Sequence, residues 1–172
     1  IATMPSIVTY WYKFSHEGLE INLVNDEDTM AGHFLHILHG QKPSDLHRKV
    51  MDVSLILYAE HEFNASTFTA RVCASTMSDI HSCVVAAIGS LRGPLHGGAN
   101  EKAMELIENW TSKEEAKSNI IEMLSKKEKI MGFGHAVYSI KDPRNAVIIE
   151  YAKELSELAD NDTLYQVAEE VE

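Results

Sequence analysis

Residues 129–145 read KIMGFGHAVYSIKDPRN, and this stretch decides how the whole chain is interpreted. It places His135 directly after a loop that contains Gly132 and Gly134. Glycine has no side chain, so such a loop lets a ligand approach the backbone closely. Histidine exchanges a proton near neutral pH. The stretch therefore predicts a ligand-binding loop with a proton donor beside it.

The end of the same stretch has the pattern of a helix start. Asp142 suits the N-cap position and Pro143 the first helical position. Arg144 then falls in the first turn, where the helix dipole and a guanidinium together attract a carboxylate. A carboxylate site is the functional interpretation of Arg144, and an ordinary surface charge is the alternative.

A second glycine-rich segment lies upstream, RGPLHGGAN at residues 92–100. His96 is followed by two glycines and then by a helical pattern. Amides at a helix start favour negative charge, and a histidine there can donate to a developing oxyanion or enolate. The alternative is a loop histidine beside turn glycines. The segment itself is either a hinge or a plain connection between helices.

A third histidine, His61, follows a long apolar helical pattern in the stretch VMDVSLILYAEHEF. His61 and Glu62 match the start of a zinc-protease helix, but Ala65 stands where the second histidine would be, which excludes that motif. The polar residues around His61 form a pocket or cap a helix end by themselves. They are Asn64, Ser66 and Thr67.

Apolar residues recur mostly at helical spacing, and no convincing alternating strand pattern occurs. NEKAMELIENW predicts an amphipathic helix, and Ser112 with Glu115 forms a capping-box signature before the next one. DPRNAVIIEYAKELSELA predicts a further helix. The fold class is therefore predicted to be all-α.

Composition excludes several classes of protein. The formal net charge of −11 argues against generic nucleic-acid binding. No apolar run reaches membrane-spanning length, and the N-terminal residues do not resemble a signal peptide. Cys73 and Cys83 fit no metal or disulfide pattern, so free thiols in a reducing cytoplasm are expected.

Three further histidines recur every three residues in GHFLHILHG. This spacing drifts around a helix and comes with no adjacent pattern of carboxylate ligands. No metal site is therefore predicted at these histidines, which are His33, His36 and His39.

LHGGAN, followed 39 residues after its histidine by GFGHAVY and then DPRN, resembles the citrate synthase family. YWYKFSHEG, GHFLHILHGQKPS, YAEHEFNASTFTAR and AIGSLRGPLHGGAN look most like its 2-methylcitrate synthase branch. One departure is Ala136, where that branch usually has proline.

The resemblance implies an all-helical, dimeric enzyme with a large and a small domain around a cleft. Residues 1–96 would belong to the large domain and residues 97–172 to the small one, at least in part. The chain would then be a central fragment that lacks the N-terminal and C-terminal pieces of the large domain.

The resemblance also implies roles for single residues. His96 would bind the thioester carbonyl and stabilise the enolate, and His135 would donate to the ketone oxygen of oxaloacetate. His61 and Arg144 would hold oxaloacetate. The adenine end of coenzyme A would meet the backbone around Lys129, Ile130, Met131, Gly132 and Phe133.

The family's catalytic base is an aspartate in a segment beyond Glu172, so this chain alone is expected to be inactive. Lys126, Lys127 and Lys129 cluster just before the glycine loop. They either offset the acidic field where coenzyme phosphates approach, or are solvated cations that interact favourably with the C-terminal end of a helix.

Three functional hypotheses follow. The first is condensation of propionyl-CoA with oxaloacetate to 2-methylcitrate and free coenzyme A. The second is citrate synthesis from acetyl-CoA, and the third is a non-catalytic module that binds oxaloacetate or a helical partner. The enzyme hypotheses imply a cytoplasmic homodimer in propionate or tricarboxylic acid metabolism. They imply an acyl-CoA thioester as substrate and no permanently bound cofactor or metal.

Overall fold

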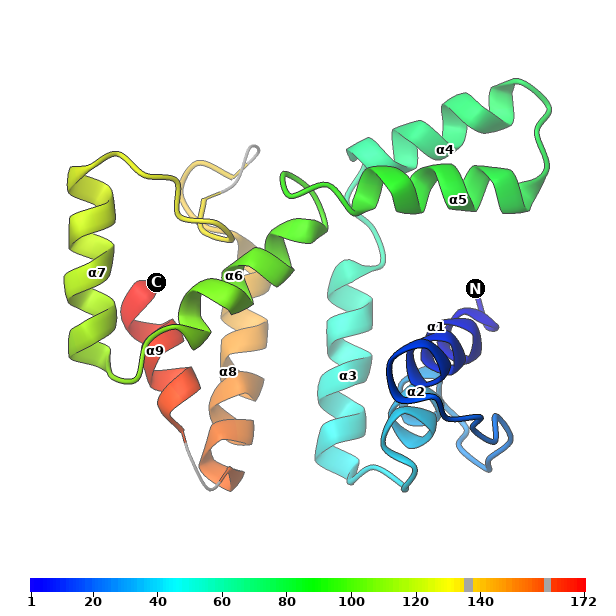
Figure 1. Ribbon diagram of the computed structural model, residues 1–172, viewed down its shortest axis with the longest axis horizontal. Helices are drawn as coiled ribbons and strands as arrows, with labels where there is room; N and C mark the ends of the chain where they lie inside the picture. Colours follow the sequence, from blue (N-terminus) through cyan, green and yellow to red (C-terminus); the bar gives the residue numbers. More distant parts are fainter. Residues whose placement is uncertain (135–137, 160–161) are drawn as a thin grey trace. The chain divides into compact units, whose positions relative to one another are not determined.

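A computed structural model describes residues 1–134, 138–159 and 162–172, shown in Figure 1. Within these ranges the chain consists of helices joined by loops, and no strand occurs. The prediction of an all-α fold is therefore confirmed. None of the helices in the described ranges is long and apolar enough to span a membrane.

The internal contacts divide the chain into two compact units, Ile1–Glu60 and His61–Glu172. This division lies upstream of His96, where the large and small domains of a complete enzyme were expected to meet. The expected boundary concerns those domains rather than local compactness, so it stays a prediction.

The first unit packs its second helix against its first and third. Thr29 and Ser44 begin the second and third helices by accepting hydrogen bonds from backbone amides in the first turn. The third helix ends at Tyr58, and His61 follows it in the loop beyond, as its place after the apolar pattern indicated. The elements are α1 (Met4–Tyr12), the π-helix η1 (Lys13–Glu17), α2 (Met30–His39) and α3 (Asp45–Tyr58).

The second unit begins with an antiparallel helix pair and continues into a four-helix arrangement (Figure 1). Asn64 and Asp79 cap the two helices of the pair. The elements are α4 (Ala65–Ser75), α5 (Ile80–Leu91), α6 (Gly98–Glu108), α7 (Lys113–Ser125), α8 (Pro143–Leu158) and α9 (Thr163–Val171).

The core of the second unit lies where α6, α7 and α9 meet. Trp110, Ala116 and Val167 are buried there. They are surrounded by the half-buried side chains of Leu106, Ile107, Ile120, Met123 and Val171. This apolar packing holds α6 in place. It thereby sets the direction of the glycine-rich segment that leads into α6.

The start of α7 follows the predicted capping box with one change. The Ser112 hydroxyl accepts a hydrogen bond from the Glu115 amide at 3.2 Å. The Glu115 carboxylate, however, accepts from the amide and hydroxyl of Thr111, both at 2.8 Å, one residue before the N-cap. These two donors hold the pKa of Glu115 below its usual value.

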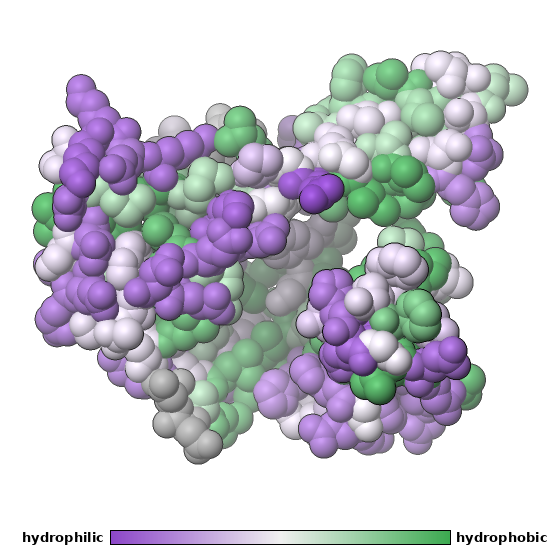
Figure 2. Space-filling view, viewed as in Figure 1, coloured by the Kyte–Doolittle hydropathy of each residue, from purple (hydrophilic) through white to green (hydrophobic). Residues whose placement is uncertain are grey.

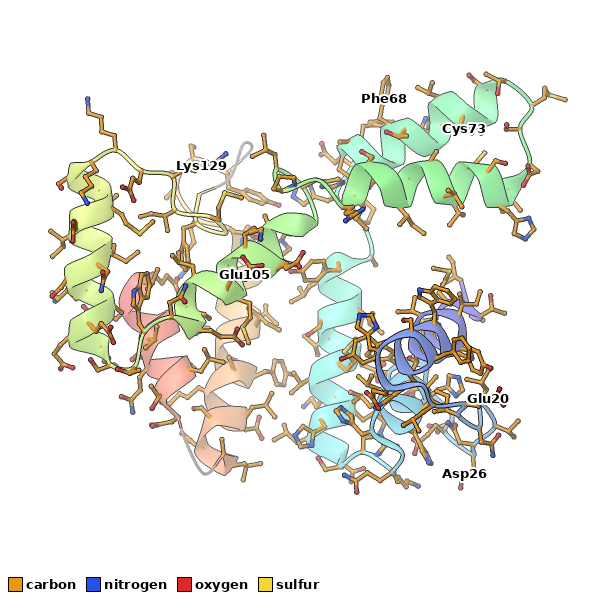
Figure 3. All side chains as sticks on the ribbon, in the orientation of Figure 1. Glu20, Asp26, Phe68, Cys73, Glu105 and Lys129 are labelled. Carbon is orange, nitrogen blue, oxygen red and sulfur yellow. The ribbon has the colours of Figure 1, made fainter. Side chains whose placement is uncertain are left out.

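The α4–α5 pair exposes a broad apolar surface, part of which is visible in Figure 2. Phe68 projects from α4 on the side away from α5 (Figure 3). Large apolar side chains exposed on this pair include Phe68, Val72, Val85, Ile88 and Leu91.

Candidate active site

His96 lies in the tight connection between α5 and α6. The carbonyl of Gly93 accepts hydrogen bonds from the amides of His96, at 2.9 Å, and Gly98, at 3.2 Å. Helix α6 begins at Gly98, so the prediction that two glycines lead from the histidine into a helix is confirmed.

Close packing requires the second of these glycines. A Cβ atom on Gly98 would lie 2.5 Å from the carbonyl oxygen of Arg92 and 2.9 Å from that of Gly93. Both are backbone atoms, which cannot turn aside as a flexible side chain can. The absence of a side chain therefore lets the connection fold back on the end of α5 and holds His96 there.

The imidazole of His96 points at the first turn of α4. Its Nε2 lies 3.2 Å from the backbone nitrogen of Ser66 and 2.8 Å from the Ser66 hydroxyl. A backbone amide can only donate, so Nε2 acts as the acceptor and the neutral ring carries its proton on Nδ1. The fold thus presents His96 as a neutral ring with an Nδ1–H donor.

The polar residues around His61 partly cap a helix, as one of the two alternatives predicted. The Asn64 side-chain oxygen accepts from the Thr67 amide at 3.1 Å and from the Ser66 hydroxyl at 2.8 Å. The Ser66 amide, by contrast, is directed at His96. The start of α4 therefore serves both as a helix cap and as a support for the histidine.

His61 and Arg144 meet at one aromatic ring. The His61 ring stands edge-on to Tyr138, with ring centroids 5.7 Å apart. The guanidinium carbon of Arg144 lies 5.9 Å from the centroid of the same tyrosine ring. The structure thus brings together the two residues that were expected to hold oxaloacetate, with Tyr138 between them.

Asp142 caps α8 as predicted, and it also binds Arg144. Its Oδ1 accepts from the Arg144 amide at 2.9 Å. Its carboxylate receives the guanidinium through Nε, at 3.0 Å, and through one terminal nitrogen, at 2.6 Å. A ligand carboxylate must compete with Asp142 for this edge of the guanidinium or bind another edge.

The loop after α7 packs closely against α6 at a glycine. Gly132 has a φ of +85°, and a Cβ atom there would lie 2.3 Å from the Cβ of Ala103 on α6. The loop backbone therefore lies directly on the helix that follows His96. Figure 3 labels Lys129 at the beginning of this loop.

The three lysines near this loop are not equivalent. Lys126 pairs with Glu122 at 2.6 Å, and this contact raises the pKa of Lys126. Part of the predicted cationic cluster is therefore offset by an acidic neighbour on α7. His135, the second predicted catalytic histidine, lies outside the described residues.

Neither Tyr138 as a site residue nor Ser66 as the partner of His96 was predicted from the sequence. Tyr138 stands three residues after His135, and this proximity was the signal in the sequence that could have identified it as a site residue. The contact of Ser66 with His96 spans 30 residues and arises only through folding.

Comparison with known proteins identifies the family of the chain. The profile of the family described as "Citrate synthase, C-terminal domain" matches residues 1–172. The chain is 62% identical over 168 residues to a 2-methylcitrate synthase of Shewanella oneidensis, a match that covers 98% of this chain and 45% of that protein. It is 45% identical to a citrate synthase of Heyndrickxia coagulans over 98% of this chain and 45% of that protein.

Solved structures show the same likeness. The citrate synthase of Thermoplasma acidophilum, in its ternary complex with carboxymethyl coenzyme A and oxaloacetate, matches with a TM-score of 0.91 and 31% identity, over 99% of this chain and 45% of that one. The chain thus spans slightly less than half the length of these relatives. From its matched profile and its helical architecture, the chain belongs to the citrate synthase family.

Proposed function

We propose that this chain forms part of an enzyme that condenses propionyl-CoA with oxaloacetate. The α-carbon of the thioester loses a proton, forms a carbon–carbon bond to the ketone of oxaloacetate, and water then cleaves the thioester to release free coenzyme A. The geometry of His96 carries the proposal, supported by the 62% identity to a 2-methylcitrate synthase.

His96 has the properties that the first step requires. The α-proton of a thioester is weakly acidic, so its removal needs stabilisation of charge on the carbonyl oxygen. The Ser66 amide fixes the other side of the ring, so an Nδ1–H donor would be available to that oxygen without reorientation of the ring. Such a donor is worth about 2.7–4 kcal/mol of transition-state stabilisation. His135 would donate to the ketone oxygen.

Oxaloacetate would bind near Tyr138. His61 and Arg144 contact this ring from two segments, and both offer donors to carboxylate or ketone oxygens. The tyrosine supplies an apolar wall that orients the two polar side chains. We propose that the oxaloacetate carboxylate displaces or shares the contact of Arg144 with Asp142.

The adenine end of coenzyme A would lie along the backbone of Lys129, Ile130, Met131, Gly132 and Phe133. The contact of Gly132 with α6 supports this assignment, because it places the loop on the same helix that begins beside His96. The protein would bind the thioester as a substrate and would need no resident cofactor or metal for this reaction.

Citrate synthesis from acetyl-CoA is the second candidate, and the 45% identity to a citrate synthase favours it. One methylene in an apolar pocket discriminates by only about 1–3 kcal/mol, so both substrates can react.

We further propose a cytoplasmic homodimer, with residues 1–96 in the large domain and 97–172 in the small one. The exposed apolar surface of α4 and α5 supports the assembly.

The test is release of free thiol by the full-length protein, followed with propionyl-CoA and acetyl-CoA in the presence and absence of oxaloacetate. We expect oxaloacetate-dependent release with a higher kcat/KM for propionyl-CoA. A higher kcat/KM for acetyl-CoA would favour citrate synthesis. Oxaloacetate binding without thiol release from either substrate would identify a non-catalytic module.

A further inference from the structure

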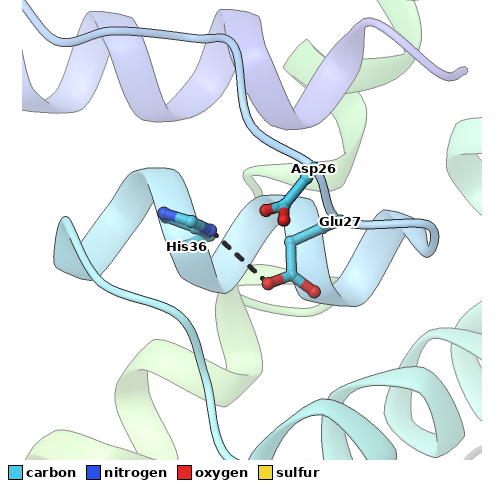
Figure 4. A group of neighbouring side chains, drawn as sticks. All are labelled: Asp26, Glu27 and His36. Atoms are coloured by element: carbon cyan, nitrogen blue, oxygen red, sulfur yellow. Dashed lines mark ion pairs between the residues drawn. The ribbon is translucent and has the colours of Figure 1, made fainter.

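Two carboxylates lie against the histidine-bearing helix of the first unit. The segment between η1 and α2 has no regular structure over residues 18–28, and it carries Asp26 and Glu27 to the side of α2 that bears His36 (Figure 4). One ligand atom from each of these three residues lies within 4.8 Å of the others. The cluster belongs to the first unit, whereas the proposed catalytic residues belong to the second.

Glu27 is unusually buried for a carboxylate. Its side chain is 1% exposed. Among the described residues, neither its Oε1 nor Nδ1 of His36 has a hydrogen-bond partner. The two atoms face each other at 3.5 Å (Figure 4). A buried polar atom without a hydrogen-bond partner destabilises the fold by about 1–3 kcal/mol. A ligand bound between these two atoms would remove that cost.

The separation of these atoms suits a metal ion. Zinc binds histidine nitrogen and carboxylate oxygen at about 2.0–2.2 Å in tetrahedral geometry, which places two ligand atoms about 3.4 Å apart. A cation between Oε1 and Nδ1 would satisfy both lone pairs. Asp26 is exposed and can turn its carboxylate to the same ion.

The surroundings hold Glu27 in this orientation. Arg48 lies 3.5 Å from the other carboxylate oxygen, Oε2, and itself pairs with Asp45. Gly32 leaves the space that Oε2 occupies, since a Cβ atom there would lie 2.6 Å from it. A ligating carboxylate is commonly fixed by a partner of this kind on its second oxygen.

We propose that Asp26, Glu27 and His36 form a binding site for a divalent transition metal of the zinc class. One imidazole and two carboxylates suit such an ion better than Mg²⁺ or Ca²⁺, which prefer oxygen ligands alone. Water would complete the coordination. By joining the irregular segment to α2, the ion would stabilise the first unit.

The histidine spacing alone predicted no metal site, because no pattern of carboxylate ligands accompanies it along the helix. Asp26 and Glu27 stand ten and nine residues before His36, outside helical spacing. The fold of the intervening segment brings them together. His39, on the same helix, is exposed and takes no part in the cluster.

The experiment uses the untagged full-length protein, first stripped with a chelator and then titrated with Zn²⁺ by calorimetry. The parent should bind one equivalent of Zn²⁺. His36→Gln and Asp26→Asn should each lower the affinity of this site for Zn²⁺ at least tenfold, the usual range for loss of a contact around a metal. His39→Gln is the matched control and should bind as the parent does. Zn²⁺ should also raise the thermal midpoint of the parent and of His39→Gln, but not that of His36→Gln.

Co²⁺ provides a readout independent of affinity. Its visible d–d absorption should indicate a site with nitrogen and oxygen ligands, and Asp26→Asn should alter it. Asp26 is exposed, so this variant keeps its fold even if His36→Gln does not. Absence of Zn²⁺ binding, or binding that neither variant weakens, would overturn the proposal and leave the cluster as a direct contact between Glu27 and His36.

Discussion

A single backbone amide decides which nitrogen of His96 carries the proton. The Ser66 amide donates to Nε2, so the proton of the neutral ring stays on Nδ1. His96→Ala in the full-length enzyme should lower kcat at least a hundredfold, because an oxyanion donor is lost. Thiol release with saturating substrates measures this, and a midpoint of thermal unfolding close to the parent's would show that the fold is retained.

Ser66→Ala is the matched control, since it removes the hydroxyl but keeps the amide that fixes the ring. Its kcat should fall less than tenfold. A loss as large as that of His96→Ala would mean that the hydroxyl, rather than the amide, positions the histidine. Unchanged turnover in His96→Ala would remove His96 from the chemistry.

Arg144 offers the second prediction at this scale. Lysine cannot reproduce the planar fork that engages a carboxylate with two hydrogen bonds. Arg144→Lys should therefore raise the KM for oxaloacetate at least tenfold and leave the KM for acyl-CoA within about twofold. Steady-state kinetics with each substrate varied in turn separate the two values.

Lys153 provides the control, because it occupies an exposed position of the same helix. Lys153→Arg should leave both constants unchanged. If Arg144→Lys keeps the parent's KM for oxaloacetate, the guanidinium serves only Asp142 and the start of α8.

At the scale of elements, much of the helical structure follows from local signals. The caps at Ser112 and Asp142 were predictable because each involves residues within a few positions along the chain. The hydrogen bond that the Thr111 amide donates to the Glu115 carboxylate depends instead on a local detail that periodicity does not encode.

The contacts of the candidate site were less predictable than its residues. The family resemblance singled out His61, His96 and Arg144, but the contacts with Ser66 and Tyr138 depend on distant segments meeting. The same reason hid the contact of Glu27 with His36, because an irregular segment of the chain sets it.

The glycine loop on α6 gives a prediction about how elements are joined. Gly132→Ala should destabilise the full-length protein by about 2 kcal/mol or more, because it combines a left-handed backbone with a Cβ only 2.3 Å from that of Ala103. It should also raise the KM for acyl-CoA. Urea unfolding and steady-state kinetics measure the two effects.

Gly134→Ala is the control. Gly134 has a φ of +89°, but a Cβ atom added there would meet no atom of the described residues within 4 Å. This change should cost only the backbone term, about 1 kcal/mol. The free energy of unfolding of the double variant Gly132→Ala/Ala103→Gly should be about 1 kcal/mol higher than the sum of the two single changes predicts. Simple additivity would mean that the loop does not press on α6.

At the scale of the whole molecule, the 172-residue chain exposes large apolar side chains on both of its units. Trp11 and Ile7 are 66% and 57% exposed, and Val85 on α5 is 68% exposed. The isolated chain should be helical but should self-associate to cover these surfaces, and it should release no thiol without the aspartate base expected elsewhere.

Sedimentation velocity across a range of concentrations tests the association, and a thiol assay tests the activity. The full-length protein is the positive control for both. A strictly monomeric chain would contradict the first expectation. Oxaloacetate-dependent turnover by the isolated chain would contradict the second and place the base among these residues.

The close approach at Gly98 also bears on how this sequence can change over evolutionary time. Every other amino acid adds a Cβ atom, and the two obstructing atoms are carbonyl oxygens of the connection itself. A neighbouring side-chain substitution therefore cannot relieve the clash. Natural drift at this codon should be confined to synonymous changes, whereas exposed positions a few residues along α6, such as Glu101, stay open to many substitutions.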